Sequence, residues 1–294
     1  MKIIKYIKKP SLILIYLSDK GFLKWLPDKT HVKLLYFVKM HKKLNLSNPQ
    51  TFNEKLQWLK LNDRKDIYTT MVDKYEVKEY VSKIIGKEYI IPTLSVYNKF
   101  KEIDFDKLPN QFVMKCTHDS GSVIVCKDKK KFNKEEVRKK INKSLKNNYY
   151  YQGREWPYKN VKPRIIIEPY LEDNKTKELT DYKIYSFNGK CDYVMTCIDR
   201  FKGQTKFIYF DRNWDIKKEL SKHGKEYGDS IEVEKPKNLD KMFEFAKKLS
   251  KNLLFIRVDF YECNGQLYFG ELTFYPSSGF DAKRTKEANE YLTK

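Results

Sequence analysis

The feature that most constrains the fold is a pair of strand-like segments that flank Asn264-Gly265. An Asn-Gly pair between two apolar runs is a strong signal for a β-hairpin. The first segment carries Arg257 and Asp259, and the second carries Glu271 and Thr273, in each case two residues apart. Because side chains two residues apart share one face of a strand, each segment is predicted to present a polar face and an apolar one.

The length of the turn decides whether the two acids meet. With a two-residue turn, Asp259 would pair with Gly270, and Glu271 would face the other way. With a three-residue turn over residues 263–265 and a left-handed Gly265, Asp259 pairs with Phe269, so that Asp259, Phe269, Glu271 and Thr273 share a face. We therefore predict the three-residue turn. Two carboxylates on one face suit Mg²⁺, which prefers oxygen ligands, although such a pair also fits a solvated surface.

The remaining pattern is helical at the front of the chain and strand-rich at the rear. Helical periodicity covers residues 1–65 with a break at Asn48-Pro49, and Thr51 to Glu54 resemble a capping box. A second helix is predicted over residues 68–85 and a short strand over 89–92. Further strands are predicted over residues 112–115, 122–125, 164–168, 181–187, 191–198 and 207–211, with turns at Asn188-Gly189 and Gly203, and further helices over 132–147 and 239–253. This order predicts an α+β protein.

Length and composition indicate a globular chain. Of its 294 residues, 40% are hydrophobic and 15% aromatic, which is enough to close a core. The apolar run at residues 12–17 is far shorter than the roughly 20 residues of a membrane span, and no signal-peptide cleavage site follows it. The five cysteines form no C-x-x-C pair, so we expect reduced thiols, no zinc site and a cytoplasmic protein.

The net charge of +21 raises the question of a polyanionic partner. Only eight of the basic residues are arginines and 52 are lysines, scattered along the chain, so we expect no nucleic-acid partner. The first 43 residues hold eleven lysines against Asp19 and Asp28, interleaved with apolar residues. This segment fits either a helical layer packed on the domain or a peripheral contact with an anionic membrane.

The usual nucleotide loops and enzyme nucleophiles are absent from the sequence. It contains no G-x-x-x-x-G-K-[ST], no G-x-G-x-x-G and no G-x-S-x-G. Lys115, however, ends a predicted strand just before Ser120-Gly121-Ser122. A lysine and a Gly/Ser loop in this order can hold phosphate oxygens, although the same order also occurs in ordinary hairpins.

An ordered series of motifs resembles the ATP-grasp ligases, and most of all their teichuronopeptide-type branch of capsule and cell-wall polysaccharide synthesis. The series comprises Asp73-Lys74, Lys115 with Ser120-Gly121-Ser122, the run from Ile167 to Leu171, Arg257-x-Asp259, and Glu271-x-Thr273-x-x-Pro276. Further stretches similar to that branch are Thr51 to Trp58, Glu155-Trp-x-Tyr158, Asp181-Tyr-Lys183 and Phe187-Asn-Gly189. The resemblance covers residues 48–281.

The resemblance implies a nucleotide site with ATP and Mg²⁺. Lys74 and Lys115 would contact the phosphates, with the loop Ser120, Gly121 and Ser122 folding over them. The segment that contains Glu168, Tyr170 and Leu171 would be the adenine hinge. Asp259 and Glu271 would hold Mg²⁺ together with Thr273, which stands where the family has asparagine, and Arg257 would stabilise the transferring phosphoryl group.

The resemblance also implies the fold and the reaction. The fold would be two α+β lobes that clamp ATP (residues 111–175 and 176–294), preceded by a helical region (1–65) and a small α/β lobe (66–110). The reaction would be carboxylate–amine ligation through an acyl phosphate on a surface polysaccharide precursor, with a uronic acid or acidic peptide as acceptor and a separate amine donor. The acceptor residues would be Arg154, Trp156, Arg164, Asp181 and Lys183.

Two other functions stay open from the sequence. A glycosyltransferase of the same pathway would use an Asp-x-Asp motif, and Asp104-x-Asp106 has this spacing. A nonenzymatic module that binds polyanions or a membrane surface would use the positive charge alone.

Overall fold

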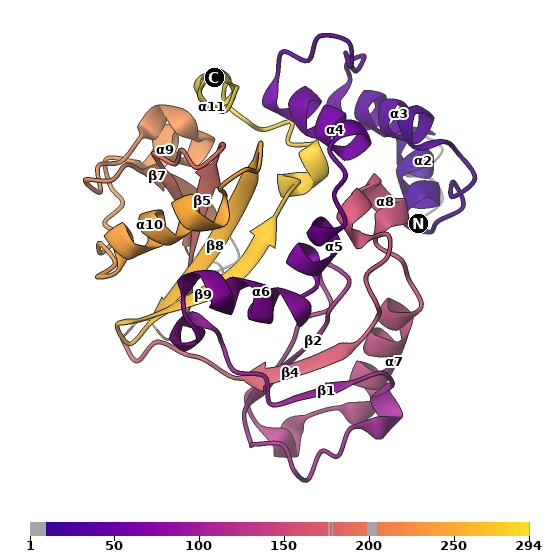
Figure 1. Cartoon of the computed structure of the whole chain (residues 1–294), viewed down its shortest axis with the longest axis vertical. Helices are drawn as coiled ribbons and strands as arrows, with labels where there is room; N and C mark the ends of the chain where they lie inside the picture. The colour runs from indigo at the N-terminus through magenta and orange to yellow at the C-terminus, as the bar shows by residue number, and fades with distance from the viewer. Residues whose placement is uncertain (1–9, 176, 178, 199–204, 294) are drawn as a thin grey trace.

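The computed structural model describes residues 10–175, 177, 179–198 and 205–293 and contains two antiparallel sheets with helices around them (Figure 1). The smaller sheet has the strand order β1-β4-β2-β3, and the larger sheet has the order β7-β6-β5-β8-β9. The predicted α+β class is therefore confirmed. The four-part division of the chain stays a prediction.

The smaller sheet has its own hydrophobic core. Its strands are β1 (Ser95–Tyr97), β2 (Phe112–Cys116), β3 (Ile124–Cys126) and β4 (Ile165–Pro169). On β2, Phe112, Met114 and Cys116 are buried, and they pack with Ile165 and Ile167 of β4. Helix α7 (Lys134–Leu145) adds Val137 and Ile141 to this core. The alternating side chains of β2, which include Lys115, point away from this core.

The larger sheet organises the main core. Its strands are β5 (Thr180–Ser186), β6 (Val194–Ile198), β7 (Lys206–Phe210), β8 (Ile256–Cys263) and β9 (Gln266–Thr273). Helix α10 (Leu239–Leu249) buries its apolar side in this core, as do α4 (Phe52–Asn62), α5 (Ile67–Val72) and α6 (Glu76–Ile85). The short helices α9 (Lys222–Tyr227) and α11 (Lys286–Tyr291) complete this half of the molecule.

The N-terminal helices α2 (Pro10–Asp19) and α3 (Asp28–Met40) lie beside α4 and the short α8 (Tyr150–Gly153) (Figure 1). The predicted capping box is confirmed at the start of α4, where the Thr51 side chain accepts from the Glu54 backbone N–H and Glu54 accepts from Thr51. This N-terminal layer thus joins both lobes at one end of the molecule.

The predicted three-residue turn of the hairpin is wrong. Cys263 pairs with Gln266, so the turn has two residues, Asn264 and Gly265, both with positive φ. The register then shifts between Asp259 and Phe260, because Gly270 forms a β-bulge. As a result Asp259 pairs with Glu271 and Arg257 with Thr273, whereas Phe269 pairs with Phe260 and faces the core. The acids meet as predicted, but the bulge and not the turn brings them together.

Two further predictions of secondary structure are corrected. The single helix over residues 68–85 is two helices, because Asp73 Oδ1 accepts the backbone N–H groups of Tyr75 and Glu76 and starts a new helix there. The strand over 89–92 is displaced to β1, and Ile90 makes only an isolated bridge to Phe269. The turn predicted at Gly203 lies outside the described residues.

Candidate active site between the two sheets

The polar face of the β8–β9 hairpin carries a buried cluster of charges. The Arg257 guanidinium donates from Nε to Asp259 Oδ1 at 2.6 Å and from its terminal nitrogen to Asp259 Oδ2 at 2.7 Å. The same nitrogen donates to Glu271 Oε1 at 2.9 Å and to Thr273 Oγ1 at 3.0 Å. Asp259 is 1% exposed, whereas the side chain of Glu271 is 47% exposed. The cluster therefore has a closed end at Asp259 and an open end at Glu271.

The neighbouring strand β5 adds a second cation to this cluster. Lys183 pairs with Asp259 across the strands, at 2.5 Å from Oδ2, and it also donates to Asp181 Oδ1 at 3.2 Å. Burial on its own would raise the pKa of Asp259, but Arg257 and Lys183 lower it below its usual range. Burial would lower the pKa of Lys183, yet Asp259 raises it. Asp259 is thus held as a carboxylate between two cations.

The smaller sheet presents a matching cluster. Lys115 lies 2.6 Å from Glu168 Oε2, and Lys78 of α6 lies 2.5 Å from Glu168 Oε1. Burial would raise the pKa of Glu168, but the two ammonium groups lower it. Lys78 also donates to the Ile91 carbonyl oxygen at 2.7 Å. Glu168 therefore engages two lysines with its carboxylate, and Lys78 is a site residue that was not predicted.

Lys74 lies where the helical segment breaks between α5 and α6. Its backbone N–H donates to the Thr117 carbonyl oxygen at 3.1 Å, and its ammonium group donates to the carbonyl oxygen of Asp119. Burial lowers the pKa of Lys74, while the negative charges of Glu271 and Asp119 raise it. Lys74 thus lies within the electrostatic reach of the open end of the hairpin cluster.

The break that places Lys74 is held by Arg164. Its guanidinium lies 2.7 Å from Asp73 Oδ2 and 2.7 Å from Glu76 Oε1, and it stacks over the Tyr75 ring at 4.9 Å. The predicted contact of Arg164 with the acceptor stays a prediction. Arg164 positions the chain around Lys74.

The loop between β2 and β3 leaves Ser120 and Gly121 exposed and turns Ser122 inward. Ser122 Oγ donates to Asp119 Oδ1 at 2.6 Å and accepts from the Cys116 backbone N–H at 2.8 Å. Gly121 has a φ of +98°, a conformation that favours glycine. Ser120 and Gly121 are thus exposed to solvent, whereas the Ser122 side chain shapes the loop.

A cavity of about 470 Å³ adjoins Lys115 and Glu168. It is walled by Val113 and Val125 of the smaller sheet, by Tyr170 and Leu171 after β4, and by Tyr261 of the larger sheet. A volume of this size with mostly apolar walls and a few polar groups is typical of a ligand site. The predicted hinge residues Tyr170 and Leu171 therefore line one cavity together with Lys115.

A third buried group lies at the far end of β9. Lys60 Nζ donates to the carbonyl oxygens of Gly153 at 2.7 Å and of Ser278 at 2.8 Å. Burial raises the pKa of the nearby Glu155, which Lys60 opposes and Glu271 reinforces. Ser278 belongs to a left-handed turn, with a φ of 52°, and a Cβ at Gly153 would lie 2.3 Å from its Oγ. Lys60, Glu155 and Ser278 were not predicted as site residues.

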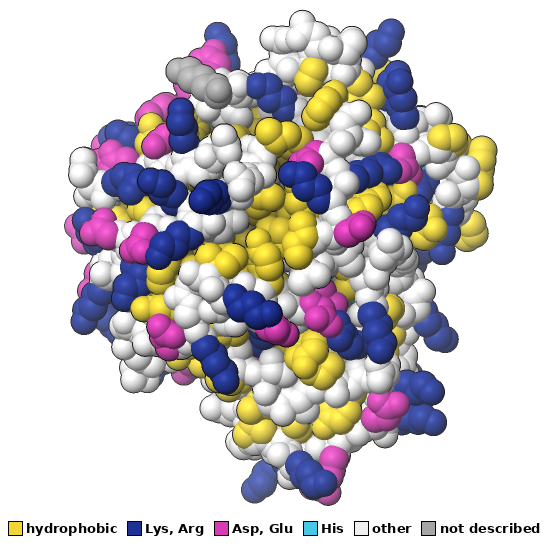
Figure 2. All heavy atoms as spheres, in the orientation of Figure 1, with side chains coloured by type: hydrophobic (Ala, Val, Ile, Leu, Met, Phe, Trp, Pro, Cys, Tyr) yellow, Lys and Arg dark blue, Asp and Glu magenta, His cyan; other side chains and the backbone are white. Residues whose placement is uncertain are grey.

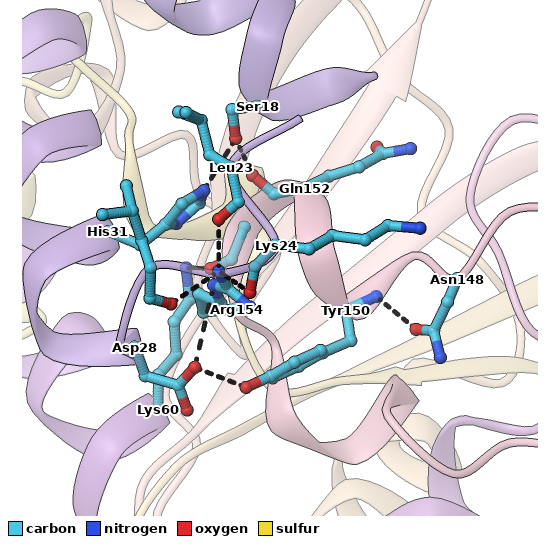
Figure 3. A network of polar contacts seen from close by, with 12 residues as sticks. Ser18, Leu23, Lys24, Asp28, His31, Lys60, Asn148, Tyr150, Gln152 and Arg154 are labelled. Atoms are coloured by element: carbon cyan, nitrogen blue, oxygen red, sulfur yellow. Dashed lines mark hydrogen bonds and ion pairs between the residues drawn. The ribbon is translucent and has the colours of Figure 1, made fainter. Parts of the chain in front are cut away.

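Arg154 and Trp156 do not reach the charged clusters. Arg154 is 1% exposed, and its guanidinium donates to the carbonyl oxygens of Leu23 at 2.9 Å and Leu26 at 3.0 Å (Figure 3). Trp156 is half-buried and packs against the main core. The Arg154 guanidinium thus anchors the loop between α2 and α3, and its predicted role in binding the acceptor stays a prediction.

Residues 54–294 match the TupA-like ATPgrasp family. The chain belongs to this family. The resemblance drawn from the motif series is thereby confirmed, and so is the ATP-grasp fold, with one charged cluster on each of its two sheets.

Solved structures similar to this TupA-like ATP-grasp chain include the D-alanine-D-alanine ligase of Helicobacter pylori, at 16% identity and a TM-score of 0.43, covering 82% of this chain and 67% of that one. The ATP-grasp ligase PsnB, complexed with a minimal precursor, Mg and ADP, matches at 11% identity and a TM-score of 0.40, covering 75% of this chain and 57% of that one. The D-cycloserine synthetase DcsG matches at 11% identity and a TM-score of 0.40, covering 77% and 69%. No curated protein matches this chain.

The donor set of this TupA-like ATP-grasp chain fits Mg²⁺. Asp259 and Glu271 pair across two strands, and Thr273 Oγ1 donates to Glu271 Oε1 at 3.0 Å. Among the described residues no group of three or more His, Cys, Asp or Glu side chains gathers as a metal site. Mg²⁺ is commonly held by one or two carboxylates plus substrate phosphates, so two acids suffice.

The Asp-x-Asp alternative lies elsewhere. Asp104 and Asp106 are exposed on a loop, where Asp104 accepts from the Asp106 backbone N–H at 3.1 Å and pairs with Lys107 at 3.2 Å. Within the described part of the chain, neither aspartate forms a hydrogen bond or ion pair with a residue of the three clusters.

Proposed function

We propose that this chain is an ATP-dependent carboxylate–amine ligase that uses Mg²⁺ and forms an acyl phosphate. The observation that carries the proposal is the polar face of the hairpin, where Arg257 binds Asp259 and Glu271, and where the negative charge of Glu271 raises the pKa of Lys74. A phosphoryl group is transferred by charge neutralisation and positioning, and not by an enzyme nucleophile. This agrees with the five buried cysteines of the chain.

In this proposal the phosphates lie between the two sheets. Lys74 and Lys115 neutralise the phosphate oxygens from one side, and Ser120-Gly121 covers them. Mg²⁺, held by Asp259 and Glu271, would neutralise charge on the β- and γ-phosphates when bound. The Arg257 guanidinium donates to Glu271, at the open end of the cluster. In this proposal it stabilises the negative charge on the γ-phosphoryl group while that group is transferred. The adenine ring occupies the cavity beside Tyr170 and Leu171.

The chemistry consists of two displacements. An oxygen of the substrate carboxylate attacks the γ-phosphorus, the bond to the β-γ bridging oxygen breaks, and ADP leaves. The nitrogen of the amine then attacks the acyl carbon, inorganic phosphate leaves, and the nitrogen loses a proton. We place the acceptor near Glu155, whose raised pKa suits a group that takes up this proton.

The acceptor is proposed to be acidic. A second cavity of about 200 Å³ lies behind the phosphate loop, with Lys140, Lys143, Ser144 and Tyr149 in its wall. Two lysines and several hydroxyl groups suit the carboxylate of a uronic acid or an acidic peptide. Lys183 pairs with both Asp259 and Asp181, so we assign Lys183 to holding Asp259, and Asp181 to holding Lys183, and neither to direct acceptor binding. A surface polysaccharide precursor fits this acceptor chemistry.

The test uses hydroxylamine as a substitute amine. The protein is incubated with ATP, Mg²⁺ and one carboxylic acid at a time, drawn from uronic acids, acidic amino acids and short acidic peptides. An acyl phosphate is expected to be captured as a hydroxamate, with one ADP and one phosphate released per hydroxamate. Lys115→Ala is expected to abolish this product, and Lys130→Ala, which changes an exposed lysine on the same lobe, is the matched control.

Two results would contradict the proposal. One is hydrolysis of ATP at the same rate with and without every carboxylic acid, with no hydroxamate. The other is turnover of a nucleotide sugar that needs no ATP, which would favour a glycosyltransferase.

A further inference from the structure

Helix α2 is apolar on its outward face as well as its inward one. Its sequence, PSLILIYLSD, has no charged residue before Asp19. Ser18 is fully buried, yet Ile13 is 41% exposed and Tyr16 is 45% exposed. Residues three apart lie on one side of a helix, so Ile13 and Tyr16 form one outward face. A helix that is apolar all round is normally covered on all sides.

The loop after α2 continues this apolar surface. Phe22 is 63% exposed and Trp25 is 75% exposed, and Trp25 is the most exposed large hydrophobic residue among those that the structure describes. Hydrophobic side chains protrude at the edge of the molecule over α2 and α3, next to Lys and Arg side chains (Figure 2). We refer to Ile13, Tyr16, Phe22 and Trp25 as the N-terminal apolar surface.

Lysines surround the N-terminal apolar surface. Lys20 lies over the Tyr16 ring at 5.6 Å, and Lys24, Lys29 and Lys33 are exposed on the loop and on α3. Residues 1–43 contain no arginine. Over the rest of the face in Figure 2, Lys and Arg side chains are scattered.

The loop that carries Phe22 and Trp25 is held rigidly from behind (Figure 3). Arg154 donates to the carbonyl oxygens of Leu23 and Leu26, and the Tyr150 hydroxyl donates to Asp28 Oδ1 at 2.5 Å. Ser18 Oγ donates to the carbonyl oxygen of Gln152 at 3.1 Å. Buried partners fix the backbone of this loop, so its aromatic rings point outward before any contact is made. Binding to a surface therefore costs little conformational entropy of the loop backbone.

We propose that the N-terminal apolar surface docks on a lipid bilayer that contains anionic headgroups, with α2 lying in the plane of the interface. Aromatic rings with lysines around them are the composition that binds such an interface. A second copy of this chain is a poorer occupant, because it would bring the same lysines together. No helix within the described residues is long and apolar enough to cross a membrane, and ten residues of α2 extend for only about 15 Å. The contact is therefore peripheral.

The docked orientation brings the acceptor cavity near the lipid surface. Gln152, whose carbonyl oxygen accepts from Ser18 of α2, also lies in the wall of the cavity that contains Lys140 and Lys143. This step rests on the proposed ligase function: an acidic acceptor carried on a lipid would be presented to that cavity. The docking surface itself does not depend on the reaction.

The test is sedimentation of the full chain with vesicles. One set contains phosphatidylcholine alone and the other contains phosphatidylcholine with phosphatidylglycerol. The chain is expected to bind the anionic vesicles and to be released by salt. Phe22→Ser/Trp25→Ser is expected to weaken binding at least about tenfold, since it removes two aromatic anchors. Lys20→Glu/Lys24→Glu, which leaves the apolar side chains in place, is expected to weaken binding to the anionic vesicles alone.

Matched controls lie on other parts of the molecule. Trp58→Ser changes a tryptophan of α4 that is 37% exposed, and Lys237→Glu/Lys251→Glu changes two exposed lysines of the larger lobe. Both are expected to bind vesicles as the unchanged chain does. The proposal is overturned if the unchanged chain stays in solution with anionic vesicles, or if the control variants lose as much binding as the N-terminal variants. Hydroxamate formation is measured in a separate experiment. If the ligase proposal fails there, the vesicle-binding result still tests the docking proposal.

Discussion

Two arginines of this chain are buried, and their surroundings differ in kind. Arg154 donates to fixed backbone carbonyl oxygens of residues 23, 24 and 26, which belong to one loop. Arg257 donates to side-chain oxygens, namely those of the Asp259 and Glu271 carboxylates and of the Thr273 hydroxyl. Arg154 is closed off from solvent, whereas the Arg257 cluster is open to solvent at Glu271.

The comparison shows that burial of a charge does not by itself mark a functional site. An arginine whose hydrogen bonds run to main-chain oxygens fixes the position of a segment. An arginine held by carboxylates, one of them partly exposed, can exchange those partners for a phosphate and a metal ion. Two properties therefore distinguish Arg257 from Arg154. The partners of Arg257 are side chains, and one of them, Glu271, is exposed to solvent.

The largest effect is expected from removing one charge in the Arg257 cluster. Asp259→Asn deletes a proposed Mg²⁺ ligand and leaves Arg257 and Lys183 without their common anion. We expect hydroxamate formation to fall by about a thousandfold. The matched control is Asp28→Asn, which changes an acid of the Arg154 network, and which is expected to keep the activity per folded molecule within about twofold. Equal losses in both variants would erase the distinction between the two networks.

Removing Arg154 is expected to act on stability alone. Arg154→Leu leaves three buried carbonyl oxygens without their donor and removes a cation beside Asp28. The free energy of unfolding is expected to fall by about 3 kcal/mol, measured by urea denaturation. Arg154→Lys is expected to recover part of it, because one ammonium group cannot reproduce the planar fork. Loss of activity at unchanged stability would instead place Arg154 in the acceptor site.

The Arg154 network is also expected to be sensitive to acid. Burial, followed by the charges of Arg154 and Lys60, lowers the pKa of His31 from 6.5 to about 4. Below pH 6.5 the unfolded chain takes up a proton that the folded chain refuses until about pH 4, so stability falls as the pH drops through this window. The loss is expected to be on the order of 2 kcal/mol. His31→Gln should flatten this part of the curve of unfolding free energy against pH; identical slopes for both chains would refute the assignment.

The smallest effect is expected at the bulge that aligns the acids. A Cβ at Gly270 would lie 2.9 Å from Tyr261 Cε2 and 3.0 Å from the Asp259 carbonyl oxygen. Gly270→Ala is expected to cost about 1–2 kcal/mol of stability and to lower activity as well, because it displaces Glu271 relative to Asp259. Gly265→Ala is the control, since Gly265 has open space and only a left-handed φ of 80°. It should lower the melting temperature and leave activity intact; the opposite pattern would contradict the role of the bulge.

Much of the fold followed from local patterns. Alternating apolar residues indicated most of the strands, and the Asn264-Gly265 pair indicated the hairpin. The meeting of Asp259 and Glu271 was predicted correctly for the wrong reason. A glycine inside a strand is itself a signal for a bulge, and Gly270 carried that signal.

The remaining site residues depend on contacts between distant segments. Lys78 and Lys60 read as ordinary helix-surface lysines, and only the packing of α4 and α6 shows what they bind. Arg154 stands beside aromatic residues in the sequence, which is typical of a ligand site. Its true partners lie about 130 residues earlier, in the loop after α2. No local pattern distinguishes these roles.

We propose that the Arg257 cluster holds Mg²⁺ and the phosphates of ATP. Binding of a non-hydrolysable ATP analogue, measured by calorimetric titration with and without Mg²⁺, shows whether it does. The unchanged chain and Asp28→Asn are expected to bind the analogue at least about tenfold more tightly with Mg²⁺ than without it, and Asp259→Asn is expected to lose this difference. Binding that is the same with and without Mg²⁺, or the same in Asp259→Asn as in the unchanged chain, would contradict the claim.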